Sequence, residues 1–476
     1  MKVRTRIAPS PTGKDVHVGS LATALMNFAW AKKNNGQFII RIEDTDRSRL
    51  VEGGEAKMLQ TFADLGLVAD ESPLVGGRYA PYRQSERLEI YKKHADELIA
   101  KGKAYYCVCT PERLDEMRKA QQAKKEIPKY DRKCYHDQEN VKKLVASGAK
   151  HVIRMLMPEE EIAFDDIVRG RVVMHGSNLD DQVILKSDGF PTYHLGVVVD
   201  DHLMDITHVL RGEEWLPSTP KHIVLFRSFG WELPLFGHLS VLRNPDKSKL
   251  SKRKNPVWAS EYVAKGILKE ALLNYLALMG WSHPEEKEIF DLDEYIRVFD
   301  IKDIQTTAPV FDPVKLEWMN GEYLRKVPSS KFQVLIEEYL EKYQPENYEV
   351  IVNNKEKFEK SIPLVQERLK KLSEYFSLCE FYYQAPTTYE VDLVEYKDLI
   401  SKTTSELTKI ENWTAQNIGD AMGRVCEETG ASRSKYFMAM RVAITGKKIS
   451  PPLNESMEIL GKEESIERLK TTISNS

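Results

Sequence analysis

We predict from the sequence a modular α/β protein, in which a parallel-sheet part with an inserted domain is followed by an all-helical part. The 476 residues of the chain exceed one ordinary core, because a domain usually holds roughly 150 residues. Up to about residue 231, short apolar runs alternate with helix-periodic stretches, which is typical of a parallel sheet. Beyond residue 328 the strand signals fade and charged amphipathic helices dominate.

The N-terminal region shows the alternating pattern most clearly. Phe38-Ile39-Ile40-Arg41-Ile42 is an apolar run of strand length. Between Leu21 and Ala29, the apolar residues at positions 21, 24, 25, 28 and 29 form one face of a helix. A loop that begins with Pro9-Ser10-Pro11-Thr12-Gly13 leads into this helix, which opens at Gly19-Ser20. We therefore expect a strand, a rigid loop and a helix N-terminus in succession.

The chain divides into four expected parts. Residues 83–195 interrupt the alternation and hold three of the five cysteines, so we expect an inserted domain there that is not part of the same sheet. The parallel-sheet domain then comprises residues 1–82 and 196–258, a linker domain covers residues 259–328, and residues 329–476 form the helical domain. Helices are expected at residues 331–343, 355–379 and 414–429.

Composition and charge exclude several classes of protein. Apolar residues make up 42% and charged residues 30% of the chain, as in a globular protein and not a disordered or fibrous one. The net charge of −3 does not indicate a polyanionic partner, so such a partner must be bound by local basic runs such as residues 118–133 and 247–254. No signal-peptide core and no apolar run of about 20 residues is present, so we expect a cytoplasmic protein without a membrane partner.

Two separate motifs suit the phosphates of a nucleotide. His17 precedes Gly19-Ser20 at the start of a helix, where unpaired backbone N–H groups and the positive end of the helix dipole favour an anion. Far downstream, Lys249 and Lys252 lie in a basic loop whose ammonium groups can neutralise a leaving pyrophosphate. Either motif alone is more often a helix cap or a solvated basic loop. Together they predict a divided ATP site.

These two motifs resemble the paired signatures of class I aminoacyl-tRNA synthetases, and the surrounding segments resemble the glutamyl-tRNA synthetases of that class. The segments that carry the resemblance are RIAPSPTG at residues 6–13, RIEDTDR at 41–47, PYRQSER at 81–87, PTYHLGVVVDDHLM at 191–204, LRGEEWLPSTPKH at 210–222, FDPVKLEWMNGEYLR at 311–325 and RVAITG at 441–446. The family implies a Rossmann-like catalytic domain, an insertion that binds the tRNA acceptor stem, a stem-contact linker domain and a helical anticodon-binding domain. It also implies a ligase, most often a monomer, that uses ATP with Mg²⁺, L-glutamate and tRNA-Glu.

The expected amino-acid site combines two arginines with a carboxylate. An acidic amino acid needs cations for its carboxylates and an anion for its ammonium group, and arginine is the best partner of a carboxylate. Arg6 at a strand end and Arg211 after the strand at residues 207–210 would both point into the crevice at the carboxyl ends of the strands, with Glu43 for the ammonium group. The resemblance extends the glutamate site to Arg6, Ala8, Ser10, Glu43, Tyr193 and Arg211. It extends the ATP site to His17, Gly19, Ser20, Glu214, Trp215, Lys249 and Lys252, with His17 and Lys252 in catalytic roles. For Trp215, ordinary core packing is the alternative.

The implied chemistry proceeds in two steps. The glutamate carboxylate first attacks the ATP α-phosphate in line, and the 2′-hydroxyl of the terminal tRNA adenosine then attacks the mixed anhydride. Positioning and electrostatics carry the rate in such a reaction, so we assign no protein nucleophile and no general base.

The clustered cysteines predict a metal site. Cys107 and Cys109 are followed by Cys134 and His136 on the other side of a basic helical segment, and three sulfurs with one imidazole complete a tetrahedral structural Zn²⁺ site. The alternative is a set of reduced buried thiols. Cys379 and Cys426 have no partner in the sequence and are expected in the core.

The chain departs from the family pattern at two places, and rival functions remain. The segment from Gly13 to His17 is one residue longer than expected, and Val197 replaces an asparagine that some relatives offer to the substrate. A shortened enzyme that glutamylates a tRNA base would lack the helical third, and a glutaminyl synthetase would carry β-barrels there. Two further alternatives are a non-catalytic synthetase-like RNA-binding protein and another nucleotidyltransferase that shares the start of the first helix.

Overall fold

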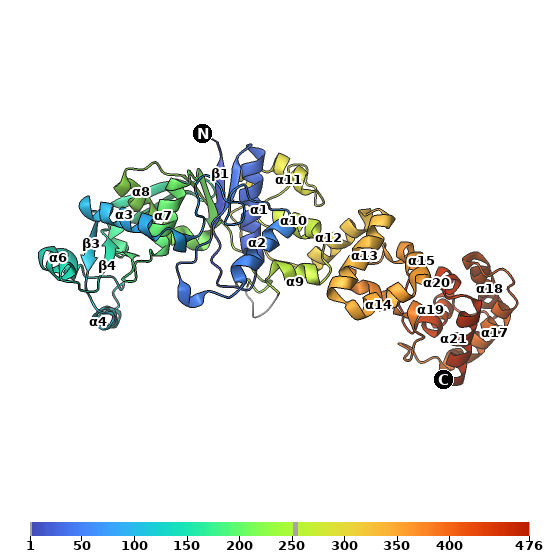
Figure 1. The fold of residues 1–476 in the computed structure, drawn as a ribbon. Coiled ribbons are helices and arrows are strands. Elements are labelled where there is room, and N and C mark those ends of the chain that lie inside the picture. The colour runs from blue at the N-terminus through green and yellow to red at the C-terminus, as the bar shows by residue number, and fades with distance from the viewer. Residues whose placement is uncertain (1, 251–255, 476) are drawn as a thin grey trace. The chain divides into compact units, whose positions relative to one another are not determined.

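The computed structural model describes residues 2–250 and 256–475 and forms two compact units (Figure 1). The first unit comprises Met1–Glu261 and Leu273–Asp312, and the second comprises Tyr262–Leu272 and Pro313–Ser476. No helix in the described part of the chain is long and apolar enough to cross a bilayer.

Parallel strands form the centre of the first unit, as the sequence predicts. β1 (Arg4–Ile7) pairs with β2 (Gln37–Ile40) in parallel, and β8 (His208–Gly212) pairs in parallel with β9 (Leu235–Leu239). The two pairs adjoin, because the backbone N–H of Thr207 donates to the carbonyl of Arg4 at 3.0 Å. All four β1 residues are buried, so the strand lies inside the layer and its carboxyl end opens onto the site described below.

Helices cover this sheet and fix the positions of its strand ends. α1 (Val18–Lys33) is apolar on most of its surface and packs against β1 and β2, in agreement with the predicted helix. α7 (Tyr193–Leu203) packs against α8 (Thr219–Phe229) and α3 (Leu88–Ala100). Further helical elements of this unit are α2 (Gly54–Asp64), α11 (Leu292–Val298), η1 (Arg47–Arg49), η2 (Gln84–Glu86), η3 (Gly176–Asn178), η4 (Glu213–Ser218) and η5 (Ile301–Asp303).

Residues 83–195 contain a second, smaller sheet together with a hairpin that joins the first sheet. β3 (Ala104–Cys107), β4 (Val152–Met155) and β7 (Val183–Leu185) are antiparallel. They lie beside α4 (Pro111–Ala123), α5 (Lys133–His136) and α6 (Gln138–Ala146), at the end of the unit coloured cyan in Figure 1. The hairpin of β5 (Glu161–Asp166) and β6 (Gly170–His175) extends the sheet of β8 and β9 instead, through parallel pairing of β5 with β9. The expectation that this region is not part of the main sheet is therefore wrong for the hairpin, and the four-part division stays a prediction.

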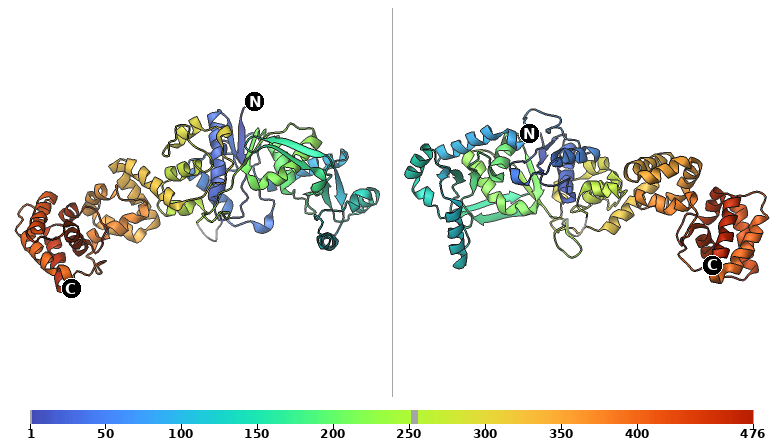
Figure 2. Two further views of the ribbon diagram at one scale, coloured as in Figure 1. Left: turned by 180° about the vertical axis from the view of Figure 1, so that it is seen from behind. Right: turned by 60° about the horizontal axis from the view of Figure 1, so that its bottom comes forward.

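The second unit is all-helical from Pro313 onward in its described residues, as predicted, and Figure 2 shows its helices in orange and red. The helices are α12 (Pro313–Lys326), α13 (Ser329–Tyr343), α14 (Pro345–Asn353), α15 (Lys355–Val365), η6 (Leu372–Glu374), α16 (Tyr375–Tyr383), η7 (Val394–Tyr396), α17 (Lys397–Thr408), α18 (Ala415–Glu428), α19 (Arg433–Thr445), α20 (Leu453–Leu460) and α21 (Lys462–Asn475). Two more helices, α9 (Ala259–Ala264) and α10 (Lys269–Ala277), lie where the chain passes between the units. Cys379 and Cys426 are buried in the core of this unit, as expected.

One predicted helix of the second unit is in fact two. The sequence predicts a continuous helix over residues 355–379, but α15 ends at Val365 and α16 begins at Tyr375. The Gln366 side chain donates to the carbonyls of Leu324 and Val327, at 2.9 and 2.6 Å. Asn320 donates to the carbonyl of Lys370 at 2.6 Å. The Asn320 bond occupies the Lys370 carbonyl, which a continued helix would use, and the Gln366 bonds hold the end of α15 against α12, so tertiary contacts override the local periodicity.

Candidate active site

A pocket opens at the carboxyl ends of β1 and β8, where a parallel sheet usually places its ligand site. It has a volume of about 320 Å³, at the lower end of the range for small-molecule sites. Most of the predicted site residues line it, and they are Arg6, Ala8, His17, Gly19, Ser20, Glu43, Tyr193, Arg211, Glu214, Trp215 and Lys249. Ser10 is not among the lining residues, and Lys252 lies outside the described residues. The structure thus brings together side chains from segments more than 200 residues apart.

His17 caps the N-terminus of α1 at the edge of this pocket. Its Nδ1 accepts a hydrogen bond from the backbone N–H of Gly19 at 3.0 Å, so the proton of the neutral ring is on Nε2. A side chain at Gly19 would bring its Cβ to 3.2 Å from His17 Nδ1, which explains the need for a small residue there. Ser20 is exposed one residue farther along the first turn. The helix start therefore offers backbone N–H groups and an imidazole donor to an anion.

The long loop before His17 is held by a buried carboxylate. Asp15 is 2% exposed and accepts hydrogen bonds from the Thr61 hydroxyl at 2.6 Å and from the backbone N–H of Ser260 at 3.0 Å. Beside it, Lys14 pairs with Glu261 at 2.9 Å. The longer loop is accommodated by these bonds to α2 and α9, and His17 still reaches the pocket.

Arg211, near the end of β8, is a buried cation whose partners are all neutral. It is 5% exposed, so the alternative of a surface ion pair does not apply. Its guanidinium donates to Tyr193 Oη at 2.9 Å, to Thr219 Oγ1 at 2.8 Å and to the ring nitrogens of His222 and His238 at 3.2 and 3.1 Å. No carboxylate lies within 4.0 Å of it among the residues that the structure describes, and burial lowers the pKa of Arg211. A buried charge without a counter-ion is costly, so this geometry is suited to an anionic ligand.

Arg6, in contrast, already has a carboxylate partner. Asp201 accepts from Arg6 Nε at 3.1 Å and from Arg6 Nη2 at 3.3 Å, and it also accepts from Arg41 Nη1 at 2.8 Å. Burial favours the neutral form of Asp201, but the two guanidinium groups outweigh it and lower the pKa of that carboxyl. Arg6 is thus fixed in the wall of the pocket by a shared counter-ion.

Glu43 belongs to the same buried charge network. Its Oε1 accepts from Arg41 Nη2 at 3.0 Å, and Arg41 is fully buried. Burial raises the pKa of Glu43, although Arg41 acts in the opposite direction. A ligand ammonium group at this carboxylate would complete its ion pairing.

The outer part of the pocket is more exposed. Trp215 is 38% exposed and stacks at a tilt on Tyr193, with ring centroids 4.2 Å apart, so the alternative of ordinary core packing is wrong. Lys249 lies 3.3 Å from Glu214 in an exposed ion pair. Val197 also lines the pocket and presents an apolar wall. An aromatic face next to a lysine is suited to a base and its phosphates.

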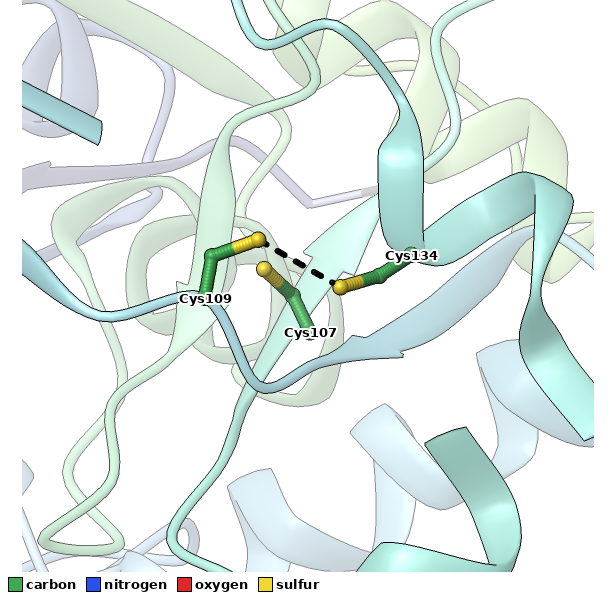
Figure 3. A group of neighbouring side chains, drawn as sticks. All are labelled: Cys107, Cys109 and Cys134. Atoms are coloured by element: carbon green, nitrogen blue, oxygen red, sulfur yellow. Dashed lines mark hydrogen bonds between the residues drawn. The ribbon is translucent and has the colours of Figure 1, made fainter. Parts of the chain in front are cut away.

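The three clustered cysteines meet outside this pocket (Figure 3). The sulfurs of Cys107, Cys109 and Cys134 all lie within 4.8 Å of one another, and those of Cys109 and Cys134 are 3.5 Å apart. A tetrahedral zinc ion with Zn–S bonds of about 2.3 Å holds its sulfurs about 3.8 Å apart. Hydrogen bonding with Cys134 foremost lowers the pKa of Cys107 to about 4, despite burial. The donor set therefore fits a thiolate-bound metal.

The hydroxyl of Tyr130 lies beside the sulfurs, where His136 was expected. Tyr130 Oη is 3.5 Å from Cys107 Sγ and 3.2 Å from Cys109 Sγ, and it accepts from the backbone N–H of Cys134 at 3.0 Å. His136 is exposed, and among the described residues its ring does not belong to the group of converging ligand atoms. Tyr130 is a residue that the sequence reasoning missed.

The buried partners of the site arginines were also missed. Asp200 and Asp201 are two acids at the end of an apolar helical run, a pattern that already signals buried counter-ions in the sequence. The histidines around Arg211 carried no comparable signal, because they lie 11 and 27 residues farther along the chain.

Comparison with known proteins identifies the relatives of this chain. The family model "tRNA synthetases class I (E and Q), catalytic domain" matches residues 2–318, and the "Anticodon binding domain" model matches residues 331–473. The glutamate–tRNA ligase of Acidothermus cellulolyticus is 44% identical over 485 residues, which covers 99% of this chain and 95% of the relative. That of Stutzerimonas stutzeri is 43% identical with the same coverage.

Solved structures agree with these matches. A glutamate tRNA ligase from Elizabethkingia meningosepticum, crystallised in complex with its amino acid, has a TM-score of 0.88 at 35% identity. The match covers 100% of this chain and 99% of that structure. The glutamate–tRNA synthetase of Elizabethkingia anophelis has the same score and identity.

Proposed function

The chain belongs to the family of class I tRNA synthetases for glutamate and glutamine, and from this premise we propose that it is a glutamate–tRNA ligase. It activates L-glutamate with ATP to glutamyl-adenylate and pyrophosphate, and it transfers the glutamyl group to the 3′-terminal adenosine of tRNA-Glu with release of AMP. One observation above all supports glutamate as the substrate. Arg211 is a buried guanidinium at the pocket whose partners in the described part of the chain are all neutral, and a side-chain carboxylate supplies the missing charge.

The pocket gives each charged group of glutamate a partner. The α-carboxylate is the nucleophile, so it must face the nucleotide near His17, and the side-chain carboxylate then extends inward to Arg211. Glu43 receives the α-ammonium group, and Arg41 keeps Glu43 oriented for it. Arg6, held by Asp201, contributes positive charge between these two ends of the substrate. The remaining predicted glutamate contacts, Ala8, Ser10 and Tyr193, belong to the same proposal.

Activation is a displacement at the α-phosphorus of ATP. One oxygen of the glutamate α-carboxylate forms a bond to phosphorus while the bond to the pyrophosphate oxygen breaks, and the electron pair leaves with pyrophosphate. The N–H groups at the start of α1 and His17 Nε2–H stabilise the phosphate charge, and Lys249 and Lys252 neutralise the leaving group. Mg²⁺ bound to the incoming ATP would neutralise part of the phosphate charge. Gly19, Ser20, Glu214 and Trp215 complete the proposed nucleotide site.

Transfer to tRNA needs no protein base in this scheme. The 2′-hydroxyl of the terminal adenosine attacks the glutamyl carbonyl, its proton passes to the departing phosphate, and AMP leaves. Residues 331–473, which match the anticodon-binding family model, are assigned to the anticodon of tRNA-Glu. The enzyme is proposed to act as a monomer in the cytoplasm.

We further propose that Cys107, Cys109 and Cys134 hold one structural zinc ion and that Tyr130 is its fourth ligand in place of His136. The converging sulfurs and the Tyr130 hydroxyl support this set. The nearby cations of Arg113 and Arg154 favour the thiolate forms, with Arg113 Nη1 at 3.5 Å from Cys109 Sγ. Zinc would supply a crosslink between β3 and α5 and no part of the reaction.

ATP–pyrophosphate exchange with glutamate and tRNA-Glu tests the proposed function. We expect exchange that depends on glutamate and is much weaker with glutamine, followed by charging of tRNA-Glu. Absence of exchange with every tRNA tried, at high enzyme concentration, would refute the ligase and leave the non-catalytic RNA-binding alternative.

A further inference from the structure

A chain of hydrogen-bonded histidines lies around Arg211 and takes no part in the two reaction steps. His238 of β9 bonds through Nδ1 to Asp166 Oδ2 at 2.5 Å and through Nε2 to Arg211 Nε at 3.1 Å. On the other side, His222 of α8 bonds through Nδ1 to Arg211 Nη1 at 3.2 Å and through Nε2 to His194 Nδ1 at 3.1 Å. Asp166, His238 and His222 are each at most 3% exposed.

The guanidinium forces one tautomer on each of these rings. Arginine has donors and no acceptor, so the nitrogens that face Arg211 must be unprotonated. The ring proton of His238 is therefore on Nδ1 and points at the Asp166 carboxylate. By the same logic the ring proton of His222 is on Nε2 and points at His194. Protonation of either ring would place two N–H groups face to face.

Asp166 is built to maintain this arrangement. Its Oδ1 accepts from the backbone N–H groups of Val168, Arg169 and His238 at 3.0, 2.8 and 3.2 Å, which leaves Oδ2 for the His238 proton. Burial acts against its charge, but the hydrogen bonds from His238 and from these backbone amides outweigh burial and lower the pKa of Asp166. The carboxylate thus acts on Arg211 through the ring and does not contact the guanidinium itself.

We propose that Asp166, His238 and His222 are positioning residues that aim Arg211 at the pocket and keep it free of any protein carboxylate, so that the site selects an anionic over an amide side chain. This inference rests on the proposed function. Four of the five N–H groups of Arg211 are held by neutral acceptors, and the fifth, on Nη2, has no partner among the described residues. A direct carboxylate partner would hold the guanidinium equally well but would neutralise the charge that the substrate needs. Tautomer-fixed histidines orient it without that loss.

Asp166→Asn tests the chain with almost no change in shape. The Asn oxygen retains the three backbone bonds, so its NH₂ group faces His238 Nδ1 and makes that nitrogen an acceptor. The His238 proton then moves to Nε2 and opposes Arg211 Nε–H. We expect the KM for glutamate in pyrophosphate exchange to rise about 10- to 100-fold, the range seen when a supporting hydrogen-bond partner of a metal ligand is lost. We expect kcat to stay within about three-fold and the preference for glutamate over glutamine to fall, because ground-state and transition-state binding weaken together.

His238→Gln provides the rescue. A glutamine side chain can place Oε1 where His238 Nε2 accepts from Arg211, and its amide cannot exchange donor and acceptor by moving a proton, as an imidazole does. Its KM should remain near that of the wild type, and Asp166→Asn added to it should have little further effect. His208→Gln is the matched control, since His208 is a buried histidine of the same sheet that does not line the pocket.

The outcomes separate the inference from the proposed function. ¹⁵N NMR of histidine-labelled protein should show the Nδ1–H tautomer of His238 in the wild type and its loss in Asp166→Asn. The positioning role would be overturned if the wild type activates glutamate and Asp166→Asn has an unchanged KM or only a lower kcat. The proposed ligase function would be unaffected by that result. An equal KM effect of Asp166→Asn in the His238→Gln background would overturn it as well. A wild type that neither activates nor binds glutamate would overturn both.

Discussion

The same substitution at two buried arginines, Arg41 and Arg211, should destabilise the protein to very different extents. Arg41 is in contact with three carboxylates, at 2.8 Å from Asp201, 3.0 Å from Glu43 and 3.6 Å from Asp200. Arg211 is in contact with neutral groups alone among the described residues. Replacement by methionine keeps much of the side-chain volume and removes the charge in both cases. The partners that remain then decide the effect on the free energy of unfolding.

Arg41→Met leaves Glu43, whose side chain is 11% exposed, without its arginine, and it removes one of the two cations of the buried Asp201. Breaking a buried pair in this way costs about 3–5 kcal/mol. At about 2 °C per kcal/mol for a unit of this size, we expect the melting temperature of the first unit to fall by about 6–10 °C.

Arg211→Met leaves no carboxylate unpaired. It deprives neutral acceptors of about 1 kcal/mol each, but it also removes a charge that is costly to bury. We expect a net loss below about 2 kcal/mol and a fall of less than about 4 °C. Glutamate binding should weaken at least about 10- to 100-fold, because hydrogen bonds to a charged group contribute about 1.5–3 kcal/mol.

Differential scanning calorimetry of the intact chain, with and without glutamate, measures both effects. Arg227→Met is the control, because Arg227 is an exposed arginine of α8 whose Nη2 donates to the backbone carbonyl of Ala163 at 3.1 Å. An Arg211→Met protein that melts as low as Arg41→Met would contradict the argument, since it would mean that Arg211 stabilises the fold as a paired charge does.

Three further predictions concern the metal site, the histidines and the lysine loop. Tyr130→Phe should retain less zinc than the wild type on dialysis against a chelator, whereas His136→Ala should retain as much; metal analysis showing the reverse would restore His136 as the ligand. Burial foremost lowers the pKa of His194 from its ordinary 6.5 to about 3, so the unfolded state binds a proton that the folded state does not. The contribution of His194 to the free energy of unfolding is therefore fully present above about pH 6.5. It declines by about 1.4 kcal/mol per pH unit as the pH falls toward 3, which amounts to a loss of about 2 kcal/mol at pH 5. Urea unfolding at pH 7 and pH 5 measures this slope, and an unchanged slope in His194→Gln would contradict the assignment. Lys252→Ala should slow pyrophosphate exchange by about 100-fold with little change in glutamate binding, and a wild-type rate would show that Lys252 is only a solvated lysine.

Much of the fold was predictable because its signals are local. The apolar face between Leu21 and Ala29 and the run at residues 38–42 correspond to α1 and β2 within a few residues. The periodicity wrongly predicts one helix over residues 355–379, where tertiary hydrogen bonds of Gln366, just after α15, and of Asn320 on α12 accompany the break in the helix. Helix propensity contains no information about these hydrogen-bond partners, because the two residues of each bond are more than 40 positions apart in the sequence.

The sequence predicts which residues belong to the candidate site, but it does not predict which of them are paired with one another. Arg6 and Arg211 were both expected to bind substrate carboxylates, and the sequence treats them alike. The structure distinguishes them, because Asp201 pairs with Arg6 and two neutral histidines hold Arg211. Tyr130 was not predicted for a similar reason, because it lies beside the cysteines only when β3 and α5 pack together in the fold.

The contrast between these arginines indicates where the fold gives up stability for function. A buried guanidinium with carboxylates around it, such as Arg41, stabilises the walls of the site and has no unsatisfied charge for a ligand. Arg211 has the same chemistry and comparable burial, yet its neighbours orient it without neutralising it. The free energy cost of burying this charge is present in the ligand-free protein and is relieved when an anion binds. The selectivity for an acidic side chain therefore follows from the lack of a carboxylate partner for Arg211 among the described residues. An amide ligand would fill the same space and leave the charge unpaired, which is why it should bind less well.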